Sequence, residues 1–92
     1  MDLSHINLLH SKLMAIKMIN ADLQDSNLYG VNLSKGDLSD AKLNNARLNW
    51  AILTDTNISN TNLQGSNLND ANLKYCNLVM ANLSRAHLQD AD

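Results

Sequence analysis

The chain has 92 residues and a formal net charge of -2, with nine acidic and seven basic side chains. Charges of both signs are scattered along it, which argues against the basic stripe of a nucleic-acid-binding protein and against an acidic block. The single Cys excludes an internal disulfide. No apolar run approaches the roughly 18 residues of a membrane span, and the repeat described below leaves no room for a signal peptide. We therefore expect residues 1–92 to form one cytoplasmic domain.

A five-residue unit repeats along the entire chain, most regularly between Asn57 and Leu88. Its leucine slot, every fifth residue from Leu3 onward, holds Leu in 16 of 18 cases, with Met18 and Ile58 as exceptions. Two residues earlier, a small-residue slot holds Ala, Ser, Thr, Gly or Cys in 15 of 19 cases. The polar slot between them holds Asn or Asp in 13 of 19 cases. The two residues after the leucine are called the first and second corner slots.

A period of five fits neither a regular helix nor a regular strand. A helix turns about 100° per residue, so every fifth leucine would point in a different direction around the cylinder. A strand alternates faces, so an odd period would expose half of the leucines. Each leucine has the same environment only if the chain makes an equivalent bend in every unit. The period predicts a coil whose leucines point to one axis, and a coil of three, four or five sides follows the same arithmetic.

The unit Ala-(Asp/Asn)-Leu-x-x, found for example at 21–25 and 71–75, resembles that of pentapeptide-repeat proteins over the whole chain. The resemblance implies an all-β fold, a right-handed quadrilateral parallel β-helix with four units to a coil, or about 4.6 coils for 92 residues. Residues 20 apart would then be stacked. We expect ladders of amides, such as Asn57 over Asn77, to add hydrogen bonds along the stack.

Residues 1–20 form the least regular part of the repeat. Ile6 and Ile16 occupy small-residue slots, and several apolar residues occupy corner slots that should face water. An apolar collar can cover the open backbone edge of a solenoid; alternatively, these side chains pack against corners of their own coil. The candidate end-capping or dimer residues, from both ends of the chain, are Leu9, Met14, Ile19, Tyr75, Val79 and Met80. They predict either an end-to-end homodimer or a segment of a longer protein.

Residues 21–60 hold the candidate partner contact, Tyr29, Trp50 and Ile52, all in outward slots. With four units to a coil, Tyr29 and Trp50 lie on the same side in adjacent layers. Exposed Trp and Tyr are typical of interface hot spots, although such rings can also lie flat over a corner and cover backbone. Lys42 and Arg47 lie nearby and could pair with an acidic partner.

The residues that carry chemistry in other proteins do not converge here. His5 and His10 project from adjacent walls and His87 lies several layers away, whereas a metal site needs three or four ligands close together. We expect His5 to form a surface pair with Asp25, and Cys76, in a small-residue slot, to be a buried, inert thiol. No catalytic triad and no glycine-rich phosphate loop is present. The sequence therefore predicts no catalytic residue, no metal, no cofactor and no enzyme activity.

The function that fits best is a non-catalytic scaffold that binds an unidentified protein partner, with no membrane contact and no direct nucleic-acid binding. The resemblance offers an alternative, because its best understood branch mimics DNA and binds DNA gyrase and related type II topoisomerases. Stacked rows of mixed charge, such as Asp22 beside Lys42, do not imitate a phosphate backbone. A third hypothesis is a structural solenoid segment of a larger effector or regulator.

Overall fold

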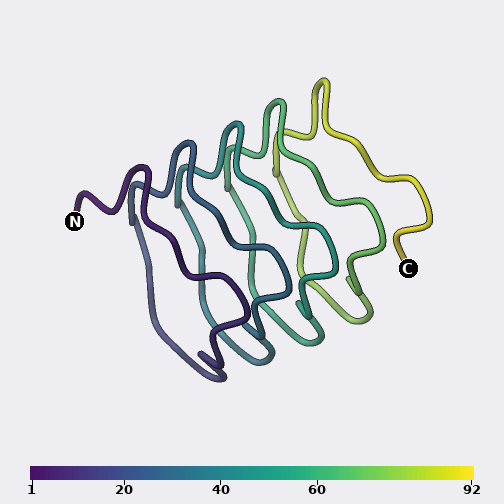
Figure 1. The fold of residues 1–92 in the computed structure, drawn as a ribbon, viewed down its shortest axis with the longest axis horizontal. Helices are drawn as coiled ribbons and strands as arrows, with labels where there is room; N and C mark the ends of the chain where they lie inside the picture. The colour runs from purple at the N-terminus through teal and green to yellow at the C-terminus, as the bar shows by residue number, and fades with distance from the viewer.

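The computed structural model describes all 92 residues as a stack of four-sided coils that advances from Met1 to Asp92 (Figure 1). Parallel bridges join residues 20 apart, from Asp2 with Asp22 to Asn67 with His87. Each bridge involves a single polar-slot residue between two corners, so no helix and no longer strand is present. No segment of the chain forms a helix able to cross a membrane. The stacking of residues 20 apart agrees with the predicted four-unit coil.

Each unit of the middle coils is tied to the adjacent coils by the same three backbone hydrogen bonds. The leucine-slot N–H of Leu43 donates to the carbonyl of Asn62 in the next coil, at 2.7 Å. The N–H of Asn62 donates back to the carbonyl of Ala41, at 3.0 Å. The second-corner N–H of Asn45 donates forward to the carbonyl of Gln64, at 2.9 Å. Every coil therefore needs a neighbour on both sides to satisfy its backbone.

The Asn and Asp side chains of the polar slot form hydrogen bonds within their own corners. They do not form the expected hydrogen bonds to the stacked residue of the next coil. The first-corner N–H has no backbone partner, and the side-chain oxygen two residues earlier accepts its hydrogen bond; Ser59 N–H donates to Asn57 Oδ1 at 3.1 Å. This Asx turn is a local alternative to inter-coil bonding. The prediction of hydrogen-bonded amide ladders was therefore wrong for the polar slot. The accepting residues are Asp2, Asn7, Asp22, Asn27, Asn32, Asp37, Asn57, Asn62, Asn67, Asn72, Asn77 and Asn82.

The second-corner residue of every unit has a positive φ, between 55° at Asn60 and 70° at Gly65. Sixteen of these residues are not glycine. This left-handed conformation is disfavoured for most L-residues and is best tolerated by Gly, Asn and Asp. Between Asn20 and Asp70, only Lys35 and Trp50 depart from these three residue types.

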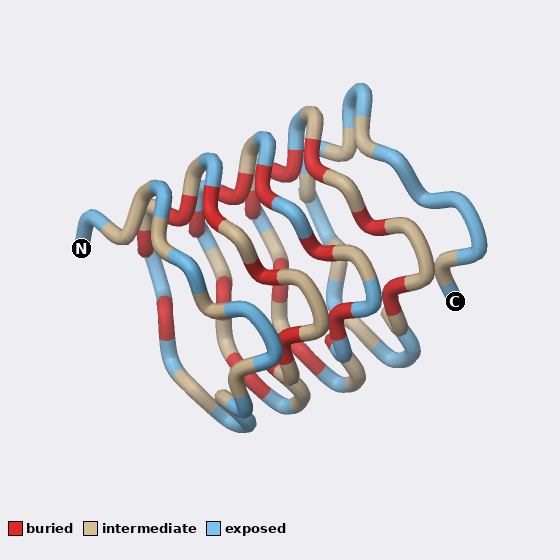
Figure 2. Tube along the Cα trace, viewed as in Figure 1, coloured by how far each residue is buried: buried red, intermediate tan, exposed pale blue.

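The hydrophobic core is a column of leucine-slot and small-residue side chains that runs through the middle coils (Figure 2). Seventeen hydrophobic residues between Met18 and Ala71 form one buried cluster. Leu3, at the first coil, is only half-buried. Buried hydroxyls lie among them: Thr61 Oγ1 donates to the carbonyl of Leu38 at 2.8 Å. Burial is complete where a coil has neighbours on both sides.

Candidate functional site

The three predicted contact residues lie on two walls that meet at one corner. Tyr29 belongs to segment 26–30 of the second coil, and Trp50 to segment 46–50 of the third. These two segments are stacked, because Gly30 N–H donates to the carbonyl of Asn49 at 2.8 Å. Ile52 follows Trp50 around the corner onto the next wall. We call Tyr29, Trp50 and Ile52 together the Trp50 surface.

The members of the Trp50 surface differ in exposure. The side chain of Trp50 is the most open, at 58% of its full exposure, and Ile52 is 39% exposed. Tyr29 is half-buried, because the ring of His10 meets it edge-on with ring centroids 5.7 Å apart. Tyr29 is thus held in place by a neighbouring ring, whereas Trp50 leaves most of its side chain exposed to solvent.

Cations lie close to this surface without an ion-pair partner. Arg47 is exposed in the middle of the segment that ends at Trp50, and Lys42 is exposed on the preceding wall. Lys74 and Asp92 form an ion pair, 3.1 Å apart, and His5 Nε2 lies 3.9 Å from Asp25 Oδ2. The predicted surface pair of His5 and Asp25 is confirmed. Neither Arg47 nor Lys42 is neutralised in this way.

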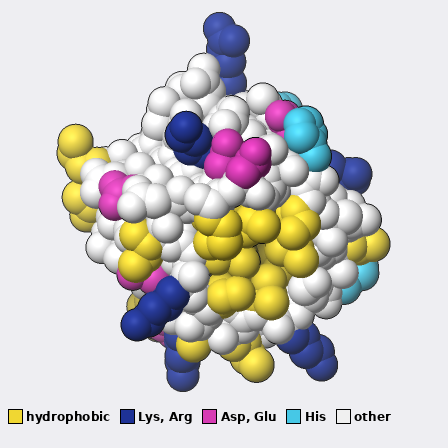
Figure 3. All heavy atoms as spheres, turned by 90° about the vertical axis from the view of Figure 1, so that its left-hand side faces the viewer, with side chains coloured by type: hydrophobic (Ala, Val, Ile, Leu, Met, Phe, Trp, Pro, Cys, Tyr) yellow, Lys and Arg dark blue, Asp and Glu magenta, His cyan; other side chains and the backbone are white.

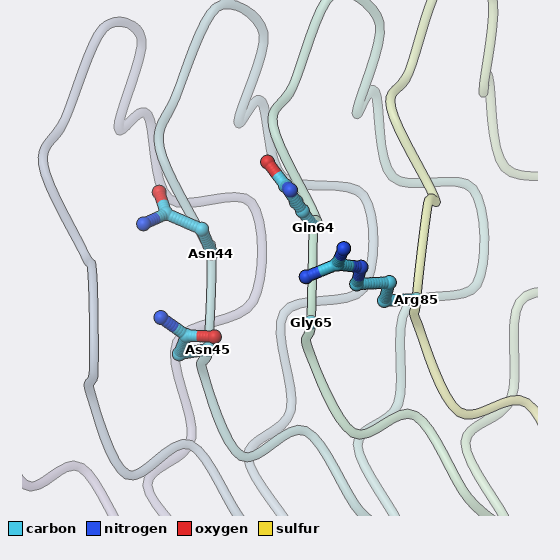
Figure 4. Close-up of a pocket in the computed structure, with 5 residues that line it drawn as sticks. All are labelled: Asn44, Asn45, Gln64, Gly65 and Arg85. Carbon is cyan, nitrogen blue, oxygen red and sulfur yellow. The ribbon is translucent and has the colours of Figure 1, made fainter.

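A notch interrupts the walls of the stack. It has a volume of about 310 Å³ and is lined by Asn44, Asn45, Gln64, Gly65 and Arg85, with no apolar side chain (Figure 4). We call these five residues the Gly65 notch. The sequence contained one signal of it, a glycine in a corner slot where sixteen other residues adopt the same positive φ. The lining holds no nucleophile and no carboxylate, so it offers no obvious catalytic group.

The candidate end-capping residues all lie on the surface. Leu9, Met14, Ile19, Tyr75, Val79 and Met80 are exposed. Ile6 and Ile16 are half-buried and pack against the core. At the N-terminal end of the stack, hydrophobic side chains gather at the centre of the face (Figure 3). Both ends of the described stack therefore present apolar surface.

The remaining candidates for chemistry are dispersed. No three or more His, Cys, Asp or Glu side chains come together in a way that could hold a metal ion. Cys76 points inward as expected but is half-buried, not buried, because no unit lies above residues 76–80. Its Sγ donates to the carbonyl of Leu53 at 2.7 Å. Burial raises the pKa of the Cys76 thiol above its ordinary value of 9.0, so it is a poor nucleophile at neutral pH.

Comparison with known proteins identifies the repeat. The sequence model of the family described as pentapeptide repeats matches residues 2–35, 37–70 and 66–92, with 8 copies of the repeat. The chain belongs to the pentapeptide-repeat family. The predicted right-handed quadrilateral β-helix is thereby confirmed. No curated protein sequence matches the chain.

Several solved pentapeptide-repeat structures are similar to this chain. A pentapeptide repeat protein (Rfr23) from the cyanobacterium Cyanothece 51142 is 36% identical over 88% of this chain and 58% of its own, with a TM-score of 0.59. HetL, a pentapeptide repeat protein involved in heterocyst differentiation regulation in the cyanobacterium Nostoc sp. strain PCC 7120, is 25% identical over 98% of this chain and 48% of its own, with a TM-score of 0.67. The present chain thus spans about half the length of these relatives.

More distant structures share the fold alone. QnrB1, a plasmid-mediated fluoroquinolone resistance protein, is 14% identical over 92% of this chain and 52% of its own, with a TM-score of 0.63. At this identity the likeness carries no information about a partner. The pentapeptide-repeat family therefore fixes the scaffold, and the side chains on its walls must supply any specific role.

Proposed function

We propose that this pentapeptide-repeat protein is a non-catalytic scaffold that binds a protein partner through the Trp50 surface. The observation that supports this proposal is the place of Trp50. Its second-corner slot has a φ of 62°, which favours Asn, Asp or Gly, and its side chain is 58% exposed. An aromatic ring is not among the residue types that this conformation favours. A large exposed indole that local conformation disfavours is a good candidate for an interface anchor.

The backbone beneath Trp50 is suited to holding such an anchor rigidly. The adjoining inward residues Leu48, Ala51 and Leu53 are all buried. The N–H of Trp50 donates to the carbonyl of Asn69 in the next coil, at 3.1 Å. An anchor on a fixed backbone loses little conformational entropy when a partner binds.

Capture experiments with matched variants test the proposal. Tagged wild-type protein, Trp50→Ala, and Lys35→Ala would be compared in an extract of the source cells. Lys35 is the control, because it is also an exposed second-corner residue other than Gly, Asn and Asp, with a φ of 61°, outside the Trp50 surface. We expect a partner retained by wild type and Lys35→Ala to be lost from Trp50→Ala, with unchanged circular dichroism. Equal capture by Trp50→Ala would refute the assignment of the anchor.

The DNA-mimic alternative, inhibition of DNA gyrase, receives less support from the arrangement of charge. The polar-slot rows run Asp22, Lys42, Asn62 on one wall and Lys17, Asp37, Asn57 on another. Neither row is a continuous line of negative charge such as a mimic of the phosphate backbone requires. We therefore expect no inhibition of gyrase-catalysed supercoiling by the purified chain.

Association between ends is a further part of the proposal. The exposed apolar side chains at both ends, Met14 and Met80 among them, favour end-to-end pairing of two copies. Light scattering over a range of concentrations would reveal a discrete dimer. A mass of 10.2 kDa at every concentration would exclude pairing of this chain. A role as a solenoid segment of a larger effector or regulator, and a cytoplasmic location, both stay predictions.

A further inference from the structure

The two second-corner glycines of the chain combine a left-handed φ with a close neighbour at the place where a Cβ would project. Gly30 and Gly65 have φ values of +66° and +70°, but sixteen other residues adopt similar values without being glycine. In each case a side chain from the preceding coil lies where a Cβ would project. At Gly30 this is the ring of His10, which packs against Tyr29. At Gly65 it is Asn45, whose Oδ1 would lie 2.5 Å from an added Cβ.

The two glycines differ in the size of the space that is left beside them. No pocket forms beside Gly30, whereas the Gly65 notch leaves about 310 Å³. Arg85 reaches toward Gly65 from the following coil, with its guanidinium directed toward the coil that carries Gln64 and Gly65 (Figure 4). Asn44 is held by a neighbour, because its Nδ2 donates to Gln24 Oε1 at 2.8 Å. The notch is therefore a space between coils with one cation and several amides at its rim.

Apart from the amide of Asn44, the side-chain donors of the notch have no hydrogen-bond or ion-pair partner within the chain. Arg85 takes part in no ion pair, since the pairs of the chain are formed by other residues. The nearest acidic residue in the same corner row, Asp25, is two coils from Gly65 and pairs with His5. A guanidinium offers paired N–H donors that match the two oxygens of a carboxylate, and side-chain amides can donate to the same group.

We propose that the Gly65 notch binds a carboxylate carried by an acidic residue of the partner segment that the Trp50 surface contacts. This inference rests on the proposed scaffold function. Asn45 and Trp50 are successive second-corner residues, so at most about 18 Å of extended chain separates them. Arg47, exposed and without an ion pair, lies between them and adds positive charge. An extended segment with an acidic and an apolar side chain about four residues apart can reach both sites.

The charges around the wall also set the direction of such a segment. Asp70 follows Trp50 in the same corner row, one coil further on, and would repel an acidic group placed near the indole. Arg85 attracts the same group at the opposite edge of the wall. The acidic end of the partner segment therefore lies over the notch and its apolar end over Trp50.

Nuclear magnetic resonance titrations with a defined probe test the proposal. The probe is the blocked peptide acetyl-Glu-Ser-Gly-Ser-Leu-amide, and its comparison is the same peptide with Gln in place of Glu. The signals followed are the backbone amide of Gly65, the Nε–H of Arg85 and the indole N–H of Trp50. We expect the Glu peptide to bind at least threefold more tightly than the Gln peptide, with the Gly65 and Arg85 signals moving together.

Two variants test whether Arg85 causes the tighter binding of the Glu peptide. Arg85→Gln should abolish it, whereas Lys35→Gln should retain it, because Lys35 is an exposed second-corner cation on another wall. Equal binding of both peptides to wild type, or a preference that survives Arg85→Gln, would overturn the proposal. Acetate that moves the Gly65 signal as strongly as the peptide at equal concentration would also overturn it, because the notch would then recognise no partner segment.

The same titration separates this inference from the proposed function. Trp50→Ala should weaken both peptides but leave the Glu preference at Gly65 intact. If Trp50→Ala changes neither the binding of the two peptides nor partner capture, the assignment of the Trp50 surface as the partner-binding site is wrong. If wild type shows no preference for the Glu peptide but partner capture still depends on Trp50, only the proposal for the notch is refuted.

Discussion

Leu53 and Leu88 occupy the same slot of the same repeat unit, yet Leu53 is 2% exposed and Leu88 is 41% exposed. The N–H of Leu53 donates to the carbonyl of Asn72 at 2.8 Å, and that of Leu88 has no backbone acceptor. The difference lies in the neighbours, because Leu53 has a coil on both sides and Leu88 has one on a single side. Burial in this fold is a property of the stack and not of the unit.

The contrast bears on function because the candidate sites are unevenly placed. Trp50 lies over the enclosed middle coils, where inward residues are buried. Arg85, which closes the Gly65 notch, belongs to the last coil, whose polar and leucine slots are more open. We therefore expect Trp50 to be a rigid anchor and Arg85 an adjustable one.

The largest expected effect comes from the core of the middle coils. Leu53→Ala should reduce the free energy of unfolding by about 2–5 kcal/mol, because it leaves a cavity with coils on both sides, and Leu53→Asp should prevent folding. Leu88→Ala should cost less than about 1 kcal/mol. Urea unfolding monitored by circular dichroism measures both. Equal losses would mean that the two leucines are equally enclosed in solution.

Two buried hydroxyls of the middle coils, those of Thr61 and Ser66, should differ in their contribution to the free energy of unfolding. Thr61→Val should cost about 1 kcal/mol of unfolding free energy, because Thr61 Oγ1 donates to the carbonyl of Leu38 at 2.8 Å. Ser66 Oγ is buried without a partner, so Ser66→Ala should be neutral or slightly stabilising. The urea unfolding midpoints of the two variants, compared with that of wild type, measure both effects. A large loss in Ser66→Ala would reveal a hydrogen bond to water at that site.

The smallest effect concerns the corner carboxylates. Hydrogen bonds from the hydroxyl and backbone N–H of Ser39, and the charge of Lys17, lower the pKa of Asp37 from its ordinary value of 3.8. The ionised form is thus favoured by folding. This stability is present above the ordinary pKa and is lost as pH falls through the lowered value.

Asp37→Asn should remove that part of the acid dependence. The Asn side chain keeps an oxygen for the N–H of Ser39 but does not titrate. Urea midpoints of wild type and variant, measured from about pH 5 down to about pH 2, should converge at the acid end. If the difference between the two midpoints is the same at every pH, ionisation of Asp37 does not stabilise the folded state.

Sequence periodicity was sufficient to predict the inward leucines and, with the family resemblance, the stacking of residues 20 apart. It did not predict what the Asn side chains do, although an Asn placed before a corner is itself typical of an Asx turn. Asn57 was assigned to a ladder because residue spacing describes stacking and not side-chain rotamers. The surface pair of His5 with Asp25 followed from the four-unit coil that the resemblance implies, since both side chains are then in the same corner row.

The candidate site was less predictable. The outward positions of Tyr29 and Trp50 follow from the slots, but the contact of His10 with Tyr29 depends on how a ring folds over Gly30. The Gly65 notch was missed for the same reason, because the space beside a glycine depends on which neighbouring side chain covers it. Cys76 was expected to be buried because its slot is inward, while its actual exposure depends on how far neighbouring coils cover it.

Native-state hydrogen exchange, measured residue by residue on monomeric protein, tests the dependence of enclosure on neighbouring coils most directly. The leucine-slot amides of Leu38, Leu43 and Leu53 donate to the next coil and should exchange only through global unfolding. Those of Leu78, Leu83 and Leu88 have no such acceptor and should exchange rapidly. Equal, strong protection of both groups in the monomer would contradict the account, because enclosure would then not depend on the coil above.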